Sequence, residues 1–164
     1  MKTCSRLISM TAVLVTALCL FTTSAWSAEG NTPESAVKGF AKAYFMLDES
    51  MADFMSEDAL VNENDVNLVE LYIRLKEDEA KNRGYKKSYL HMHPILMKTE
   101  VVEMGEEEAV VTLNTTALRS INPLYRIVGW VFGLIKEHEF ETTYTLVKED
   151  GVWKVGPGAL DAMI

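Results

Sequence analysis

The stretch TLVKEDGVWKV, residues 145–155, decides the fold of this chain. Phe140, Thr142, Tyr144 and Leu146 alternate with polar residues as they approach it, which is the period of a strand with one buried face. The pair Asp150-Gly151 then separates two strand-like segments, and an Asp-Gly pair in that place is a strong signal of a two-residue hairpin turn. We therefore predict an antiparallel hairpin at this end of the chain.

The period of two extends upstream of the hairpin. Residues 109–118 are rich in β-branched side chains, with Ala109, Val111 and Leu113 on one face. Residues 88–102 have the same period, and we expect a strand there that is broken or bent at Pro94, because proline cannot donate to a β-ladder. The second half of the chain is therefore predicted to be an antiparallel meander.

The first half has the spacing of helices. Thr32-Pro33-Glu34 is a typical helix start, and apolar residues then recur at helical spacing to about Leu47. A short second helix is expected over 50–55, and a third begins near residue 68 and stops at Gly84. The apolar stripe of the third helix is predicted to be Leu68, Leu71, Tyr72 and Leu75. Helices followed by strands predict an α+β fold, with the helices packed on one face of a curved antiparallel sheet.

We expect one hydrophobic core between the helices and the sheet. Its predicted members are Phe40, Tyr44, Leu71, Tyr72, Val111, Tyr144 and Trp153.

Two stretches resemble the NTF2-like superfamily of small cone-shaped α+β domains, which includes ketosteroid isomerase and SnoaL-type polyketide cyclases. PESAVKGF at 33–40 is similar to the opening helix of many secreted members, and 145–155 is similar to their closing hairpin. The resemblance covers most of 32–157 and implies a pocket between the first and third helices and the concave sheet. No catalytic motif of the superfamily matches, so no catalytic residue is carried over to this chain.

The candidate pocket residues are the tyrosines and histidines of these elements. They are Tyr44, Tyr72, His91, His93 and Tyr144. The pair His91-x-His93 has a spacing that can hold a divalent metal, but a closed site needs about four ligands and nothing places the others nearby. We predict neither a metal site nor a cofactor. No Ser-His-Asp or Cys-His arrangement is present, and no particular carboxyl is marked as a buried general base.

Residues 1–27 have the layout of a secretory signal peptide. Lys2 and Arg6 precede an uncharged apolar run, and the small residues Ala25 and Ser27 favour cleavage after Ser27. An uncut membrane anchor is the alternative. Cleavage would leave a single domain, 28–164, in the periplasm or the extracellular medium, without cysteine because both cysteines lie in the leader.

The charge balance excludes one class of partner. The leader holds two of the 16 Lys and Arg residues and none of the 24 Asp and Glu residues, so 28–164 carries a net charge of −10. Nucleic-acid binders normally present a basic patch, and we therefore expect no nucleic-acid partner.

The stretch PLYRIVGWVFGLI, residues 123–135, is apolar apart from Arg126 and lies between two predicted strands. We call it the apolar insert. One interpretation is two long strands that meet at Gly129 or Gly133 inside the core, since short apolar runs do not distinguish strand from helix. The other is an exposed surface for a dimer, a lid or membrane contact. Its candidate contact residues are Leu124, Ile127, Trp130 and Phe132.

Two functions remain open at this stage. The first, which we favour, is a non-catalytic envelope protein that binds a small apolar ligand or a protein partner through the cone pocket or the apolar insert. The second is a small lyase or isomerase that works in the same pocket by acid–base chemistry. A buried carboxyl beside a His or Tyr would favour the enzyme, and an apolar pocket would favour the binder.

Overall fold

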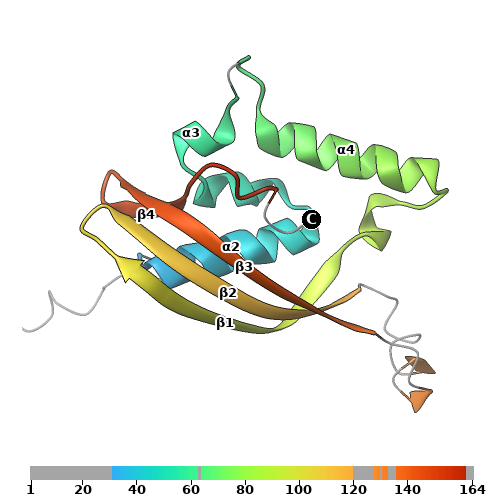
Figure 1. The fold of residues 1–164 in the computed structure, drawn as a ribbon. Helices are drawn as coiled ribbons and strands as arrows, with labels where there is room; N and C mark the ends of the chain where they lie inside the picture. Colours follow the sequence, from blue (N-terminus) through green and yellow to red (C-terminus); the bar gives the residue numbers. More distant parts are fainter. Residues whose placement is uncertain (1–30, 63, 120–127, 130, 133–135, 162–164) are drawn as a thin grey trace, which may run out of the picture. The chain divides into compact units, whose positions relative to one another are not determined.

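The computed structural model describes residues 31–62, 64–119, 128–129, 131–132 and 136–161. Within them, helices precede strands, and the predicted α+β fold is confirmed (Figure 1). The helical elements are α2 (Pro33–Met46), the 3-10 helix η1 (Glu49–Phe54), α3 (Glu57–Leu60), α4 (Leu68–Asn82) and the 3-10 helix η2 (Lys87–Tyr89). The strands are β1 (Met92–Met104), β2 (Glu108–Arg119), β3 (Glu137–Glu149) and β4 (Val152–Val155).

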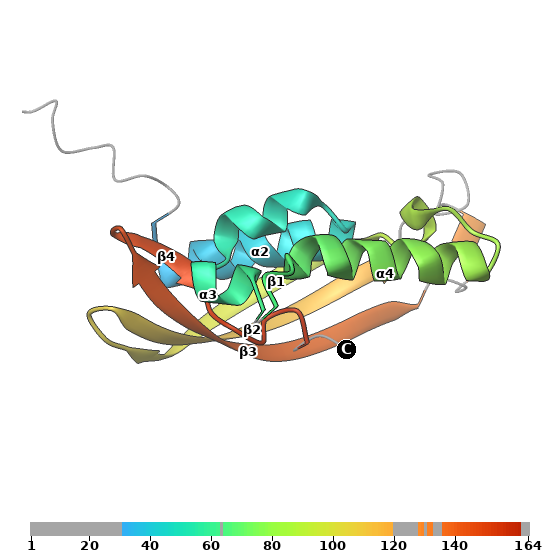
Figure 2. The same ribbon diagram turned by 90° about the horizontal axis from the view of Figure 1, so that it is seen from above.

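The four strands form one antiparallel sheet in the order β1-β2-β3-β4. The predicted hairpin joins β3 to β4, where Glu149 pairs with Val152. Its turn residues Asp150 and Gly151 have φ angles of 51° and 80°, as a two-residue turn of this kind requires. α2 lies along one face of the sheet, and α4 lies on the same side of the sheet as α2 (Figures 1 and 2).

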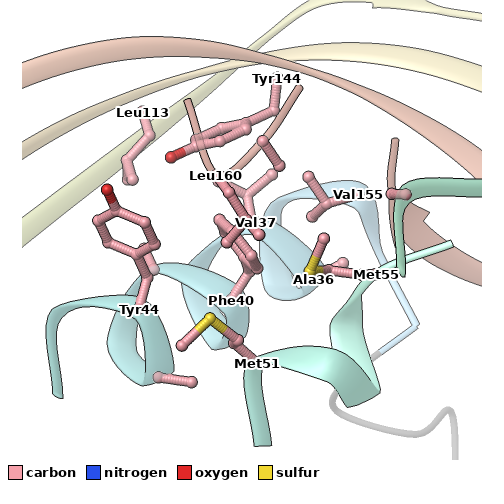
Figure 3. Close-up of a cluster of buried hydrophobic side chains, with 14 of the residues drawn as sticks. Ala36, Val37, Phe40, Tyr44, Met51, Met55, Leu113, Tyr144, Val155 and Leu160 are labelled. Atoms are coloured by element: carbon pink, nitrogen blue, oxygen red, sulfur yellow. The ribbon is translucent and has the colours of Figure 1, made fainter. Parts of the chain in front are cut away.

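The core lies between α2 and the sheet. α2 starts as predicted: the Thr32 hydroxyl accepts from the Ser35 N–H, and the Ser35 hydroxyl accepts from the Thr32 N–H. Gly39 of α2 allows a close approach to η1, because a Cβ there would lie 2.3 Å from the Phe54 ring. Figure 3 shows how side chains of α2, η1, β2, β3 and the C-terminal segment meet. Five of the predicted core residues are buried: Phe40, Tyr44, Val111, Tyr144 and Trp153.

The predicted stripe of the third helix is correct in part: Leu68 and Tyr72 pack against the core, and Leu71 and Leu75 do not. α4 buries Val69, Ile73 and Ala80, whereas Leu75 is 58% exposed. Tyr72 is half-buried against the core, and Leu71 is half-buried outside it. α4 therefore buries a stripe that lies one position further along the helix than the predicted one.

Three smaller expectations also change. The short second helix is a 3-10 helix, and the four-residue helix α3, capped by the Ser56 hydroxyl, was not expected at all. The first strand begins at Met92, because Lys87–Tyr89 form η2. The expected bend at Pro94 is present as a shift of the β-register between Pro94 and Leu96.

The apolar insert does not continue the two strands as far as Gly129. β2 ends at Arg119 and β3 begins at Glu137, while Val128, Gly129 and Val131 are helical. Val128, Val131 and Phe132 are exposed, Phe132 to 71%. The candidate contact residues Leu124, Ile127 and Trp130 lie outside the described residues, as does Gly133. Among the helices of the described ranges, none is long and apolar enough to cross a bilayer.

Candidate functional site

Two tyrosines from different helices stack on each other and line a cavity. Tyr44 of α2 and Tyr72 of α4 have ring centroids 5.2 Å apart and planes 22° apart. The cavity has a volume of about 190 Å³, and we call it the tyrosine cavity. Its other lining residues are Phe45, Leu47, Lys76, Glu79, Leu90, Met92, Arg119 and Phe140.

The end of α2 brings this wall together. Leu47 caps the helix in the left-handed conformation, with φ 51°, and its N–H bonds to the carbonyls of Ala43 and Tyr44. The helix thus ends directly beside Tyr44 and Phe45, and both stay buried. The Phe45 ring lies 5.3 Å from the Phe140 ring of β3, so helix and sheet meet at the cavity wall.

Three charged side chains line the tyrosine cavity: Lys76, Glu79 and Arg119. Lys76 Nζ is 3.2 Å from Glu79 Oε2, and Arg83 Nη2 is 2.9 Å from Glu79 Oε1. Lys76 Nζ also lies 5.7 Å from the centre of the Tyr72 ring. Glu79 is the carboxylate among the lining residues, and it is already engaged by two cations. It is therefore poorly suited to act as a general base.

The tyrosine hydroxyls stay protonated at neutral pH. Burial raises the pKa of Tyr44, an interaction with the Tyr72 hydroxyl lowers it, and the charge of Asp161 raises it, with a net upward shift. Burial raises the pKa of Tyr72 well above its ordinary value, and the interaction with Tyr44 raises it further. Both hydroxyls are therefore neutral hydrogen-bond donors in a wall of apolar and charged side chains.

Tyr144 is placed differently from the other two predicted tyrosines. It is 2% exposed and packs edge-on against Phe40, with the two ring centroids 5.7 Å apart. It does not line the tyrosine cavity. Its hydroxyl has no hydrogen-bond partner within the described part of the chain. Burial raises the pKa of Tyr144, and the nearby Tyr44 raises it further. Figure 3 shows the Tyr44 and Tyr144 rings on the two sides of the core, with Leu113 near both.

A second cavity shares Tyr72 with the first. It has a volume of about 160 Å³, and we call it the leucine groove. Its lining residues are Met55, Ala59, Leu68, Leu71, Tyr72, Leu75, Gly158, Ala159, Leu160 and Asp161. Gly158 adopts a φ of 83°, which a side chain would disfavour, and this turn brings Ala159 and Leu160 into the core. Asp161 is exposed at the groove.

The two predicted histidines lie near β1, outside both cavities. His91 precedes the strand and His93 is within it, and both are half-buried. The His91 Nε2 atom is buried without a partner among the described residues. Burial lowers the pKa of His91, as do the charges of Lys87 and His93, while Asp48 opposes them. The described residues contain no cluster of three or more His, Cys, Asp or Glu that could hold a metal ion.

Sequence reasoning named two of the lining residues, Tyr44 and Tyr72, and missed the rest of both walls. The missed leucines of the groove were visible as an apolar stripe, but we assigned that stripe to the core. Residues 156–161 carry one signal of a turn in the sequence: Gly156 and Gly158 directly precede the apolar residues Ala159 and Leu160.

Comparisons with known proteins identify similar folds. No protein-family model and no curated protein match the sequence. An NTF2-like protein of unknown function from Shewanella oneidensis is 13% identical, with a TM-score of 0.42 over 73% of this chain and 88% of its own. A protein provisionally named a ketosteroid isomerase, from Shewanella frigidimarina, is 17% identical, with a TM-score of 0.42 over 77% of this chain and 93% of its own.

A third solved structure is a protein provisionally named a scytalone dehydratase, from Novosphingobium aromaticivorans. It is 15% identical, with a TM-score of 0.37 over 74% of this chain and 75% of its own. The NTF2-like resemblance noted in the sequence thus has counterparts among solved structures. At these TM-scores the likeness concerns the arrangement of elements, and we base no argument about function on it.

Proposed function

We propose that this chain is a non-catalytic binding protein that holds a small, mostly apolar molecule in the tyrosine cavity. The observation that carries the proposal is the wall itself: five aromatic or aliphatic side chains, together with Lys76, Glu79 and Arg119, line a cavity that holds two protonated phenols. Small-molecule sites are typically of this kind, with a few polar groups that fix the orientation of the ligand. A dry cavity of about 150 Å³ accommodates benzene, so about 190 Å³ suits a one-ring ligand.

The phenols favour a ligand with an oxygen acceptor. The two buried hydroxyls interact with each other, and a hydrogen bond between two hydroxyls uses only one of their two protons. The second proton then stays available for a carbonyl or ether oxygen. An unpaired carboxylate base is missing from the lining residues, which supports binding over acid–base catalysis.

A second candidate function, acid–base catalysis of the lyase or isomerase type, has one observation in its favour. Asp161 and Tyr72 line the same leucine groove, so a carboxylate and a phenol face one apolar space. Asp161 is exposed, however, and catalytic carboxyls of this kind work in a buried apolar setting. Binding therefore remains our preferred proposal.

We also propose that the protein is exported and cut after Ser27, on the charge order and small residues of 1–27. N-terminal sequencing of the protein from the periplasmic or extracellular fraction should give a chain that starts at Ala28. An intact Met1 in the membrane fraction would show a retained anchor instead.

The binding proposal can be tested with two probes that differ in one acceptor. Acetophenone carries a carbonyl, and ethylbenzene has nearly the same shape without it. In titrations followed by ¹H–¹⁵N correlation spectra, both should shift resonances of the cavity residues. Acetophenone should bind about 2- to 10-fold more tightly, the ratio that one net hydrogen bond of about 0.5–1.5 kcal/mol gives.

The double variant Tyr44→Phe/Tyr72→Phe keeps both rings and removes both hydroxyls, so it should bind the two probes equally. The matched control is Tyr85→Phe/Tyr89→Phe, the other stacked tyrosine pair, whose centroids are 4.5 Å apart and which does not line the cavity. It should keep the preference for acetophenone. The proposal fails if neither probe shifts the cavity resonances, or if the preference survives the loss of Tyr44 and Tyr72 hydroxyls.

A further inference from the structure

β1 presents an outer edge with exposed apolar side chains. It is the first strand in the order of the sheet, and in the described part of the chain only β2 pairs with it. Four of its large apolar side chains are exposed: Ile95 to 56%, Leu96 to 51%, Val102 to 58% and Met104 to 62%. An unpaired strand edge exposes N–H and C=O groups that can accept another strand.

Two irregularities bound the regular part of this edge. The register with β2 shifts between Pro94 and Leu96 and again between Val101 and Glu103, so residues 96–101 pair without interruption. Met97 and Val101 pack against the core, and Leu96, Lys98 and Glu100 are exposed on the alternate positions. The exposed face of the regular stretch thus carries one cation and one anion two residues apart.

That order of charges is self-complementary for one antiparallel register. When two copies pair about a two-fold axis perpendicular to the sheet, residues directly opposite each other lie on the same face. An axis at Thr99 places Lys98 opposite the partner's Glu100 on one face, and Met97 opposite the partner's Val101 on the other. An axis at Lys98 or at Glu100 would place two like charges opposite each other, which is destabilising.

We propose that two copies of this chain associate along β1, in antiparallel register about Thr99, and so join their sheets edge to edge. Lysines and bulges on an edge strand often prevent such pairing. Here the acid two residues beyond the lysine gives each cation an opposite charge in the partner, and the bulges lie outside the stretch that pairs. One strand pair is smaller than a standard protein interface, so the dimer should be weak and concentration-dependent.

Charge reversal tests the register. Sedimentation equilibrium over a wide concentration range should show a monomer–dimer equilibrium for the unmodified chain. Lys98→Glu and Glu100→Lys each turn two attractive cross-strand pairs into two repulsive ones, and each should raise the dimer dissociation constant by about 10-fold or more. The double variant Lys98→Glu/Glu100→Lys restores opposite charges and should restore the dimer.

Two controls separate this surface from others. Glu141→Lys reverses a charge on β3, two strands inward in the row of Lys98 and Asn114, and should leave the dimer unchanged. Phe132→Glu changes the exposed part of the apolar insert and should also leave it unchanged. Circular dichroism on each variant checks that the fold is retained.

A crosslink gives an independent measurement. In a Cys4→Ser/Cys19→Ser background, Thr99→Cys places two thiols opposite each other across the axis and should form a disulfide-linked dimer under mild oxidation. Lys98→Cys, which faces the partner's Glu100, should crosslink far less. Three outcomes would each overturn the proposal. They are a chain that is monomeric at every concentration, two single charge reversals that leave the dimer dissociation constant unchanged, and a double reversal that does not restore it.

Discussion

Tyr144 carries a polar atom in an otherwise apolar environment. Its ring packs in the core beside Phe40, and its hydroxyl has no partner among the described residues. A buried hydroxyl without a hydrogen bond costs about 1–3 kcal/mol, whereas the ring itself contributes to the core. The hydroxyl therefore opposes the stability that the ring supplies.

We expect Tyr144→Phe to raise the free energy of unfolding by about 1 kcal/mol at pH 7, because it removes the unpaired hydroxyl and keeps the ring. It should also alter the alkaline response. Because the folded-state pKa of Tyr144 is raised, its phenol ionises at a lower pH in the unfolded chain than in the folded one. The free energy of unfolding should therefore be unaffected by this group below about pH 10 and should fall above it. Each such phenol adds up to about 1.4 kcal/mol per pH unit to that fall. Urea unfolding between pH 7 and pH 11 measures both effects.

Tyr85→Phe serves as the control for the measurement at pH 7, because Tyr85 is exposed and the loss of its hydroxyl should leave the free energy of unfolding unchanged there. A lower stability of Tyr144→Phe at pH 7 would contradict the prediction. It would indicate that the hydroxyl finds a partner in solution, such as a water molecule or a ligand.

At the scale of elements, the best sequence predictions came from local chemistry. The helix start at Thr32-Pro33 and the turn at Asp150-Gly151 each depend on backbone preferences of two or three residues, and both are present. Such signals are independent of what the element packs against, so they can be recognised before the fold is known.

α4 shows what local chemistry cannot decide. Its apolar residues form two stripes one position apart, and the helical period fits both. The structure buries Val69, Ile73 and Ala80 fully, and the leucines line the leucine groove, where only Leu68 also packs against the core. Which stripe faces inward depends on how closely α4 approaches its neighbours, and that is a property of tertiary packing.

The candidate site was predictable in part for the same reason. The resemblance implied a pocket between the first and third helices, and Tyr44 and Tyr72 do meet there across α2 and α4. Four more residues of the wall lie on these helices or at the end of α2, but Leu90, Met92, Arg119 and Phe140 come from the end of η2 and from β1, β2 and β3, which are far apart in the sequence. No spacing rule connects such residues, so they could be found only from the structure.

At the scale of the whole molecule, the net charge favours solubility and the exposed apolar surface opposes it. Residues 28–164 carry a net charge of −10, which favours solubility, yet the apolar insert exposes Val128, Val131 and Phe132. Exposed apolar patches commonly mark contacts with proteins or membranes. We propose that the insert is such a surface, separate from the β1 edge.

Phe132→Glu tests this proposal. Because Phe132 is 71% exposed, a charge there should change the free energy of unfolding by less than about 0.5 kcal/mol. Phe40→Ala, at a fully buried position, should cost about 3–5 kcal/mol in the same urea titration. Co-sedimentation with neutral phosphatidylcholine vesicles should weaken in Phe132→Glu, since a charge on the apolar surface must be desolvated on contact. If Phe132→Glu unfolds the protein as Phe40→Ala does, the insert belongs to the core and the surface proposal is wrong.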